Sequence, residues 1–139
     1  MVDVSIVFRA LNEERWFEDA LKACKSQKLD GLTSEIILVD SGSTDGTLAI
    51  AERYGCNIRH IGKSEFTFGR SLNWGCEAAS GQYLVFISAH CIPTEDGWLQ
   101  ALLQPLIDGS ADYTYGRQIG DSDSNFSEKR LFEKYFPAF

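Results

Sequence analysis

The chain has 139 residues, of which 44% are hydrophobic and 12% aromatic, which is enough apolar side chain to build the core of one domain. This composition excludes a disordered chain, and no apolar run approaches the roughly 20 residues that a membrane-spanning helix needs. The formal net charge of -7 argues against a nucleic-acid partner, and it makes any site for a polyanion depend on local basic residues or on a metal ion.

The first half of the chain alternates predicted strands with predicted helices. Residues 4–8 and 36–39 are apolar, β-branched runs typical of buried strands, and residues 57–61 form a shorter one. Between them, residues 13–27 have the periodicity of an amphipathic helix, and a helix that starts within residues 43–45 and ends near 54 opens with good N-capping side chains.

The second half continues this alternation. The elements predicted there are a helix over 70–79, a strand over 83–87, a helix over 95–107, a fifth strand over 112–117 and a short amphipathic helix over 127–136. Pro105 must kink or interrupt the helix that contains it, because proline lacks the backbone N–H that a helix interior requires.

The order of the elements predicts an α/β fold. Strands that are continuously apolar, and not alternating, indicate a mostly parallel sheet with helices on both faces. The carboxyl ends of parallel strands meet at one edge, where ligands bind in open α/β sheets. Polar residues cluster at the predicted strand ends, namely Arg9, Asn12 and Glu13, then Asp40, Ser41 and Ser43, then Ser88 and His90, and finally Arg117 and Gln118.

Several nucleotide-binding signatures are absent from the sequence. There is no GxxxxGK[ST] phosphate-binding loop, and the turn "RALNEER" has none of the glycines of a dinucleotide-binding fold. No GxSxG elbow of a hydrolase occurs either. The four cysteines, Cys24, Cys56, Cys76 and Cys91, contain no CxxC pair, so we expect reduced thiols in a cytosolic protein.

Four segments carry a resemblance to a known family. "VSIVFRALNEE", "EIILVDSGSTDGT", "GRSLNWGCEAASGQYLVFISAHCIP" and "GWL" resemble, in that order and over residues 2–120, the inverting family-2 glycosyltransferases of the GT-A fold. "SAHCIP" and "YGRQ" further resemble bacterial members of a rhamnosyltransferase-like subgroup. The resemblance implies transfer of a sugar, with inversion, from a UDP- or dTDP-sugar to a hydroxyl acceptor (a glycan or a lipid-linked sugar) in cell-surface polysaccharide synthesis.

The resemblance also implies roles for individual residues. Asp40 corresponds to the carboxylate that accepts a hydrogen bond from the imide N–H of uracil or thymine, and Asp45 is either a second acid of that loop or only a helix cap. Arg9 stands where many members have proline, and it either reaches a phosphate or pairs with Glu13 or Asp40. The residues expected to bind the donor nucleotide are Arg9, Asn12, Glu13, Asp40, Ser43, Asp45, Arg70, Ser88 and Arg117.

The family's metal-binding D-x-D motif is replaced here by Ser88, Ala89 and His90. The resemblance therefore implies a divalent cation, Mn²⁺ or Mg²⁺, with His90 as its one protein ligand, and an imidazole suits Mn²⁺ better than Mg²⁺. Two alternatives remain open: a protonated His90 contacts phosphate directly, or His90 is structural.

The resemblance divides the chain into a donor-binding half, residues 1–120, and an incomplete acceptor-side region, residues 121–139, that opens with a mobile loop. The general base of the family is expected beyond Phe139, so we expect a fragment of a longer cytoplasmic enzyme that works at the inner face of the membrane. The alternative is a non-catalytic nucleotide-binding or interaction domain. The predicted helix over 127–136 gathers apolar side chains on one face, which predicts self-association or a disordered tail for a fragment.

Overall fold

The structure is a computed structural model that describes residues 1–124 and 126–138. The chain forms two compact units, residues 1–101 and residues 102–139. The first unit holds the sheet, and the second holds the helix nearest the C-terminus.

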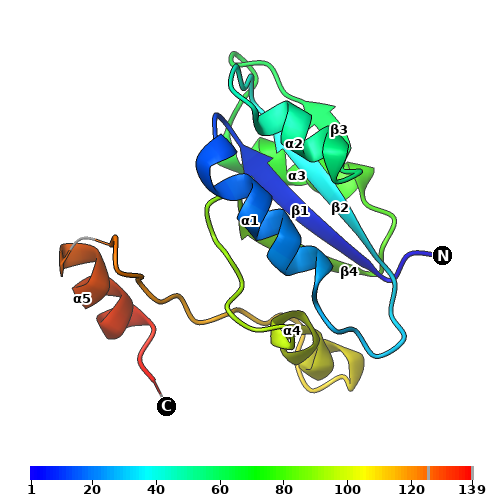
Figure 1. The fold of residues 1–139 in the computed structure, drawn as a ribbon. Coiled ribbons are helices and arrows are strands. Elements are labelled where there is room, and N and C mark those ends of the chain that lie inside the picture. The colour runs from blue at the N-terminus through cyan, green and yellow to red at the C-terminus, as the bar shows by residue number, and fades with distance from the viewer. Residues whose placement is uncertain (125, 139) are drawn as a thin grey trace. The chain divides into compact units, whose positions relative to one another are not determined.

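The first unit is built on a parallel sheet (Figure 1). Its strands are β1 (Val4–Ala10), β2 (Ser34–Asp40), β3 (Asn57–His60) and β4 (Tyr83–Ser88). The described strands follow the order β3-β2-β1-β4, and every neighbouring pair is parallel. Because β1 and β2 are central and almost fully buried, they need the continuous apolar runs that the sequence contains. The predicted α/β fold is confirmed.

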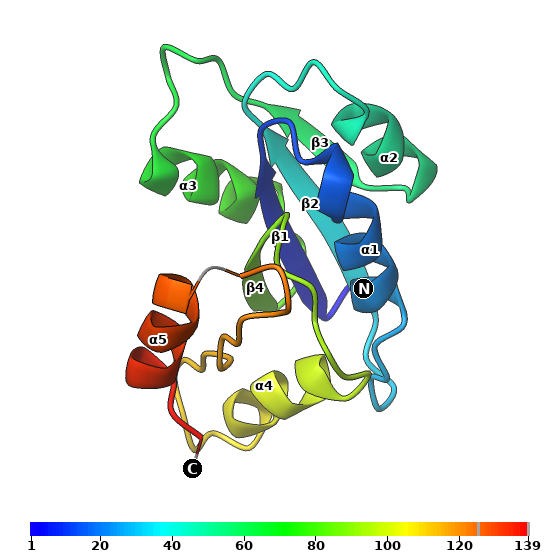
Figure 2. The ribbon, with the colours of Figure 1, turned by 60° about the vertical axis from the view of Figure 1, so that its left-hand side comes forward.

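Helices cover both faces of this sheet (Figure 2). α1 (Glu14–Lys25) and α2 (Thr47–Arg53) lie on one face, and α3 (Phe68–Ala78) lies on the other. Successive side chains of a strand point to opposite faces, so β1 serves both layers. Phe8 meets Phe17 of α1 edge to face, with ring centroids 5.4 Å apart. Val7 belongs to the core cluster on the other face, against which Trp74 of α3 packs.

Small residues allow the α3 layer to lie close to the sheet. A Cβ atom added at Gly75 would collide with the side chain of Val7, and one added at Gly81 would lie 2.7 Å from the backbone N of Ser5. The Glu35 carboxylate accepts hydrogen bonds from Ser5 Oγ (2.6 Å) and from Ser80 N and Oγ (both 2.8 Å). Burial alone would raise the pKa of Glu35, but these hydrogen bonds together lower it. The segment that leads into β4 is thus fixed to β1 and β2.

The strand register brings the polar strand ends to one level. Arg9 is paired with Val39 of β2 and Ser88 of β4, and Ala10 is paired with Asp40. The edge predicted to hold a ligand therefore exists, with the ends of β1, β2 and β4 side by side.

The two remaining helices are α4 (Trp98–Ile107) and α5 (Phe126–Tyr135). α4 starts later than predicted and continues for two residues past Pro105, which lies in its last turn. α5 agrees with the predicted helix over 127–136 to within one residue at each end. No helix among the described residues is long and apolar enough to cross a membrane.

The predicted fifth strand over residues 112–117 is wrong. The structure describes this segment as irregular, with Tyr113 79% and Tyr115 76% exposed. Thr114 Oγ1 donates to the carbonyl oxygen of Leu102 at 2.8 Å, so the segment bonds to its own unit. Aromatic and β-branched residues favour a strand only where a neighbouring strand supplies the hydrogen bonds, and pattern alone does not reveal that partner.

The cysteines are free thiols, as predicted. Burial raises the pKa of Cys24 to about 12 and that of Cys56 to about 11. The pKa of Cys91 is also raised, by burial first and then by the charge of Glu13. Thiols with raised pKa values stay protonated at neutral pH, so these three cysteines serve packing and are poor nucleophiles and metal ligands.

Candidate functional site

Two loops at the edge of the sheet are joined by reciprocal hydrogen bonds. In the loop after β1, Asn12 N donates to Ser43 Oγ (2.9 Å), and Glu13 N donates to Thr47 Oγ1 (2.9 Å). In return, Thr44 N of the loop after β2 donates to Asn12 Oδ1 (2.8 Å). Asn12 has a φ of 55°, a left-handed conformation that asparagine tolerates better than most residues. These bonds fix the two loops relative to each other.

Asp45 and Glu14 complete this network. Asp45 Oδ1 accepts from Thr47 N (2.9 Å) and its Oδ2 accepts from Glu14 N (3.1 Å). Glu14 Oε2 accepts from Gly46 N at 2.6 Å. Burial alone would raise the pKa of Asp45, but the hydrogen bonds from Thr47 and Glu14 outweigh it and lower the pKa. We call the hydrogen-bonded segments 12–14 and 43–47 the loop frame.

Asp40 shapes the start of the loop that follows β2. Its side chain is 1% exposed, and its carboxylate accepts from Gly42 N (3.0 Å) and Ser43 N (3.2 Å). Gly42 has a φ of 104°, which a side chain would strain. His60 Nδ1 lies 3.6 Å from Asp40 Oδ2. An ionised carboxylate has about four lone-pair sites, so the two N–H donors leave acceptor capacity for a further partner.

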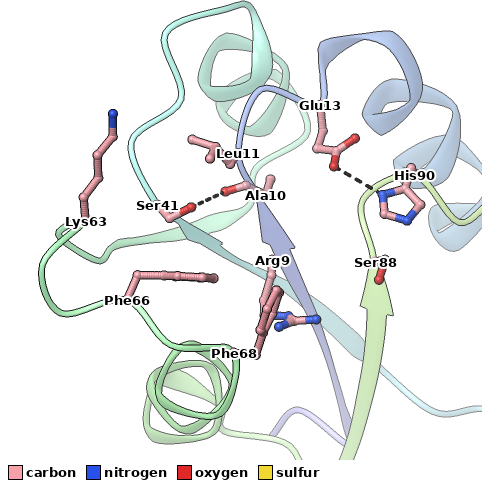
Figure 3. Close-up of a pocket in the computed structure, with 10 residues that line it drawn as sticks. All are labelled: Arg9, Ala10, Leu11, Glu13, Ser41, Lys63, Phe66, Phe68, Ser88 and His90. Atoms are coloured by element: carbon pink, nitrogen blue, oxygen red, sulfur yellow. Dashed lines mark hydrogen bonds and ion pairs between the residues drawn. The ribbon is translucent and has the colours of Figure 1, made fainter.

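A cavity of about 330 Å³ opens beside the loop frame (Figure 3). It lies at the carboxyl ends of β1, β2 and β4, and the loop between β3 and α3 and the first residue of α3 also line it. The residues that line it are Arg9, Ala10, Leu11, Glu13, Ser41, Lys63, Phe66, Phe68, Ser88 and His90. The cavity thus joins an aromatic wall to a set of charged side chains.

Charge in this cavity is opposite to that of the whole chain. Two lining residues, Arg9 and Lys63, are positively charged, whereas the chain as a whole has a net charge of -7. Among the described lining residues the carboxylate is that of Glu13, whose Oε1 lies 3.2 Å from His90 Nδ1. A cavity with cations in excess, on an otherwise acidic surface, favours an anionic ligand.

Arg9 has an unusual environment. Its Cζ lies 4.9 Å from the centre of the Phe68 ring, a cation–π distance, and Phe68 in turn meets Phe66 edge to face at 5.4 Å. Arg9 Nη1 is buried and has no hydrogen-bond partner among the residues that the structure describes. Neither pairing considered from the sequence, with Glu13 or with Asp40, is formed within that part of the chain.

The structure brings some of the predicted site residues together and separates others. Arg9, Glu13, Ser88 and His90 line the cavity. The side chains of Asn12, Ser43 and Asp45 are engaged in the loop frame, and the buried Asp40 accepts from the backbone of residues 42 and 43. Binding to a nucleotide stays a prediction for all the predicted site residues, whether or not they line the cavity.

The two predicted arginines outside the cavity have other partners. Arg70 Nη1 donates to the carbonyl oxygen of Glu65 at 2.6 Å. Its own backbone N–H donates to the Thr67 side chain that caps α3. Arg117 belongs to the second unit, where its Nε donates to the carbonyl oxygen of Phe136 at 2.8 Å. Neither residue is among those that line the cavity.

Sequence reasoning missed Lys63, Phe66 and Phe68. All three belong to "GKSEFTFG", a segment interpreted only as a loop. The available signal was its position, since it follows a parallel strand at the edge where ligands bind. Phe66 also packs against the core cluster that contains Val7, whereas Phe68 is 71% exposed.

The donor atoms for a metal ion are few. Within residues 1–124 and 126–138, no three His, Cys, Asp or Glu side chains come together as a metal-binding group. Glu13 Oε1 and His90 Nδ1, 3.2 Å apart, are two adjacent donors that suit one divalent ion if a ligand supplies further oxygens. His90 as a metal ligand stays a prediction.

Comparison with solved structures shows that the fold is shared with known proteins. The fold is shared with TarS of S. aureus, whose crystal structure aligns with a TM-score of 0.68 at 20% identity over 87% of this chain and 24% of that one. Glucosyl-3-phosphoglycerate synthase of Mycobacterium tuberculosis, in complex with Mn²⁺, UDP and glucosyl-3-phosphoglycerate, aligns with a TM-score of 0.57 at 30% identity over 76% of this chain and 39% of that one.

The family is shown by the sequence. The family model for glycosyl transferase family 2 matches residues 5–138, and the chain belongs to this family. The O-antigen chain rhamnosyltransferase WbaN of Salmonella anatum is 33% identical over 100 residues, which are 71% of this chain and 32% of that protein. Glycosyltransferase AglE of Haloferax volcanii is 28% identical over 94% of this chain and 47% of its own length. The chain thus spans about a third to a half of these relatives.

Proposed function

We propose that this chain is the donor-binding part of a glycosyltransferase that moves a sugar from a UDP- or dTDP-sugar to a hydroxyl acceptor with inversion. The observation that carries the proposal is the cavity at the sheet edge, which joins aromatic and cationic side chains in a member of glycosyl transferase family 2. A nucleotide sugar offers both a flat base and a diphosphate, and it matches this combination. The UDP complex of the related mycobacterial synthase supports the same choice of donor.

The lining residues suggest how a donor would lie. The base fits between Leu11 and Phe66, close to Asp40, whose remaining acceptor capacity would take the imide N–H. The diphosphate would lie toward Arg9 and His90, where positive charge collects. Selection of uracil or thymine follows, since a base without that N–H leaves a buried acceptor unpaired.

Transfer with inversion takes place in one displacement at the anomeric carbon, and the protein must assist it in two ways. The acceptor hydroxyl attacks the anomeric carbon, the bond to the diphosphate breaks, and the diphosphate leaves with the electron pair. The protein must take the hydroxyl proton and stabilise the leaving diphosphate. The cationic residues of the cavity would stabilise the leaving diphosphate. Glu13, the carboxylate among its described lining residues, is already paired with His90, so we assign the general base to chain beyond residue 139.

Glu13 and His90 would hold the divalent cation, Mn²⁺ or Mg²⁺, that this reaction type uses. When bound, the cation would neutralise charge on the departing diphosphate. The alternative is that a protonated His90 contacts the phosphate directly, and the 3.2 Å contact between the two side chains is compatible with either arrangement.

The wider role is proposed on the same basis. We assign residues 1–120 to donor binding, residues 121–139 to the start of an acceptor-side region, and the whole enzyme to polysaccharide synthesis at the cytoplasmic face of a membrane. The rhamnosyltransferase named among the relatives supports a glycan acceptor. A non-catalytic nucleotide-binding domain is the competing function.

Calorimetric titration with UDP, dTDP and CDP tests the proposal, because cytosine lacks the imide N–H. We expect UDP and dTDP to bind at least about tenfold more tightly than CDP, and Asp40→Asn to weaken UDP binding by about 1–3 kcal/mol, because an amide presents a donor to the imide N–H. His60→Asn is the control, because it changes an exposed neighbour of Asp40 and leaves the Asp40 carboxylate in place. Equal affinity for all three nucleotides, or none for any, would exclude a UDP- or dTDP-sugar site.

A further inference from the structure

We infer that Arg9 binds a phosphate oxygen of the donor through a guanidinium that Phe68 holds in place, and that this contact gives diphosphate binding a part that needs no metal ion. The inference rests on the proposed function, and it concerns which group in the cavity neutralises the phosphates.

The first observation is that one nitrogen of the guanidinium, Nη1, lacks a hydrogen-bond partner among the described residues. Arg9 Nη1 is buried and makes no hydrogen bond to any residue in the described part of the chain. A buried donor without an acceptor costs free energy, and for a charged group the cost is larger. A strand end could avoid this cost with almost any apolar side chain. An oxygen-rich anion in the adjoining cavity would remove it.

The second observation is that the guanidinium is held in a defined place. Arg9 projects from β1 to the face that α3 covers, and its Cζ lies 4.9 Å from the centre of the Phe68 ring (Figure 3). Stacking on an aromatic ring keeps the planar fork of N–H groups in one orientation, which preorganises it for binding phosphate. Phe68 itself is 71% exposed, which core packing alone would not favour.

The third observation is that the nearby acids are already engaged. The Glu13 carboxylate faces His90, and Asp40 accepts from the backbone of its own loop. Arg9 is the strand-register partner of Ser88, so its positive charge enters the cavity beside the end of β4, on the side where the diphosphate is proposed. Its charge is therefore available to a ligand and is not consumed by an internal ion pair.

The test separates the phosphate contact from the base contact. The 139-residue chain is titrated with uridine, UMP and UDP in the presence of EDTA, and again with MnCl₂. We expect the wild type to bind UDP more tightly than uridine even in EDTA. Arg9→Gln should weaken UDP binding in EDTA by about 10- to 100-fold and leave uridine binding within about twofold, because a charge-assisted hydrogen bond is lost.

Matched variants assign the effect to the oriented guanidinium. Arg9→Lys keeps the charge without the planar fork and should be intermediate, and Phe68→Leu should weaken UDP but not uridine. Arg15→Gln is the control, because Arg15 also stacks on an aromatic ring, Trp16 at 4.4 Å, but lies outside the cavity. The melting temperature of Arg9→Met should stay level or rise, since the variant removes an unpaired buried donor.

Each other outcome has a definite meaning. If EDTA abolishes UDP binding by the wild type, or if Arg9→Gln binds UDP as tightly as the wild type, the inference fails and the proposed function stands. If the wild type binds neither uridine nor UDP under any condition, both fail. If Arg9→Met unfolds the chain at lower temperature, Arg9 serves the fold, and the inference is overturned.

Discussion

The contact between Glu13 and His90 is the feature of the cavity whose chemistry can be changed most simply. Glu13 Oε1 and His90 Nδ1 lie 3.2 Å apart beyond the ends of neighbouring strands. Either both atoms coordinate one metal ion, or a hydrogen bond joins them. The two cases differ in what a carboxylate at position 90 would do. With a metal ion it is a better ligand for a hard cation, and without one it faces the like charge of Glu13.

We therefore predict that His90→Asp makes UDP binding depend on Mg²⁺. Affinity should fall in EDTA, because two carboxylates then face each other and a phosphate, and Mg²⁺ should restore it by at least about tenfold, or about 1.4 kcal/mol. Calorimetry with EDTA, Mg²⁺ and Mn²⁺ measures this, and His90→Asn, of equal size but uncharged, is the control. A His90→Asp variant that Mg²⁺ does not rescue would favour the imidazolium contact.

The position of a site residue could be predicted from the sequence when that residue lies in a strand, and less well when it lies in a loop. Arg9 and Ser88 lie in paired strands, and strand periodicity and order place such residues directly. Asn12 and Asp45 lie in loops, where a polar side chain looks the same whether it binds a ligand or another loop. Their bonds to Thr44, Thr47 and Glu14 depend on backbone turns that a residue pattern does not specify.

At the level of elements, the tight packing of α3 on β1 depends on the absence of one side chain. Gly75 faces Val7 in the middle of α3, at a point where a Cβ atom has no room. Helix propensity alone would favour alanine there by about 1 kcal/mol. An alanine at position 75 would therefore favour the helix by its propensity but would collide with Val7.

We predict that Gly75→Ala destabilises the protein by about 1–3 kcal/mol, the usual cost of overpacking a tight contact. Gly69→Ala is the matched control in the same helix, because nothing lies within 4 Å of its added Cβ, and it should be neutral or stabilise by up to about 1 kcal/mol. Urea unfolding followed by circular dichroism measures both. Equal stability of Gly75→Ala and the wild type would show that α3 can shift away from β1 at little cost.

Elements were predictable where local pattern and tertiary context agree. β1 and β2 are the buried apolar runs that a covered parallel sheet requires, and α1 has one clear apolar stripe. β4 is also an apolar run, but it ends the described strand order, and its Leu84 and Phe86 are 40% and 47% exposed. Residues 112–117 have the composition of a strand but no strand beside them in the part of the chain that the structure describes. Strand formation depends on a partner, and the identity of a partner is not a local property.

At the level of the whole molecule, α5 carries large apolar side chains that are exposed. Leu131 is 51% and Tyr135 65% exposed, and they lie one turn apart on the same side. Apolar side chains gathered in this way favour association with another surface.

We predict that the chain self-associates through α5. Its average mass in solution should rise above the 15.5 kDa of one chain with increasing concentration, and Leu131→Lys with Tyr135→Lys should keep it monomeric. Light scattering over a concentration series measures this. Glu52→Lys on the exposed side of α2 is the control, because it changes net charge by the same amount. A wild type that stays monomeric throughout the series would contradict the prediction.

The loop frame bears on how such a protein diverges during evolution. Its hydrogen bonds run between segments 12–14 and 43–47, whereas Leu11, Lys63 and Phe66 line the cavity from positions outside it. Substitutions at the lining positions can alter the preferred ligand of the cavity while the frame still joins the two loops. A lineage can therefore acquire a new ligand in single steps, each of which leaves a folded protein for selection to act on.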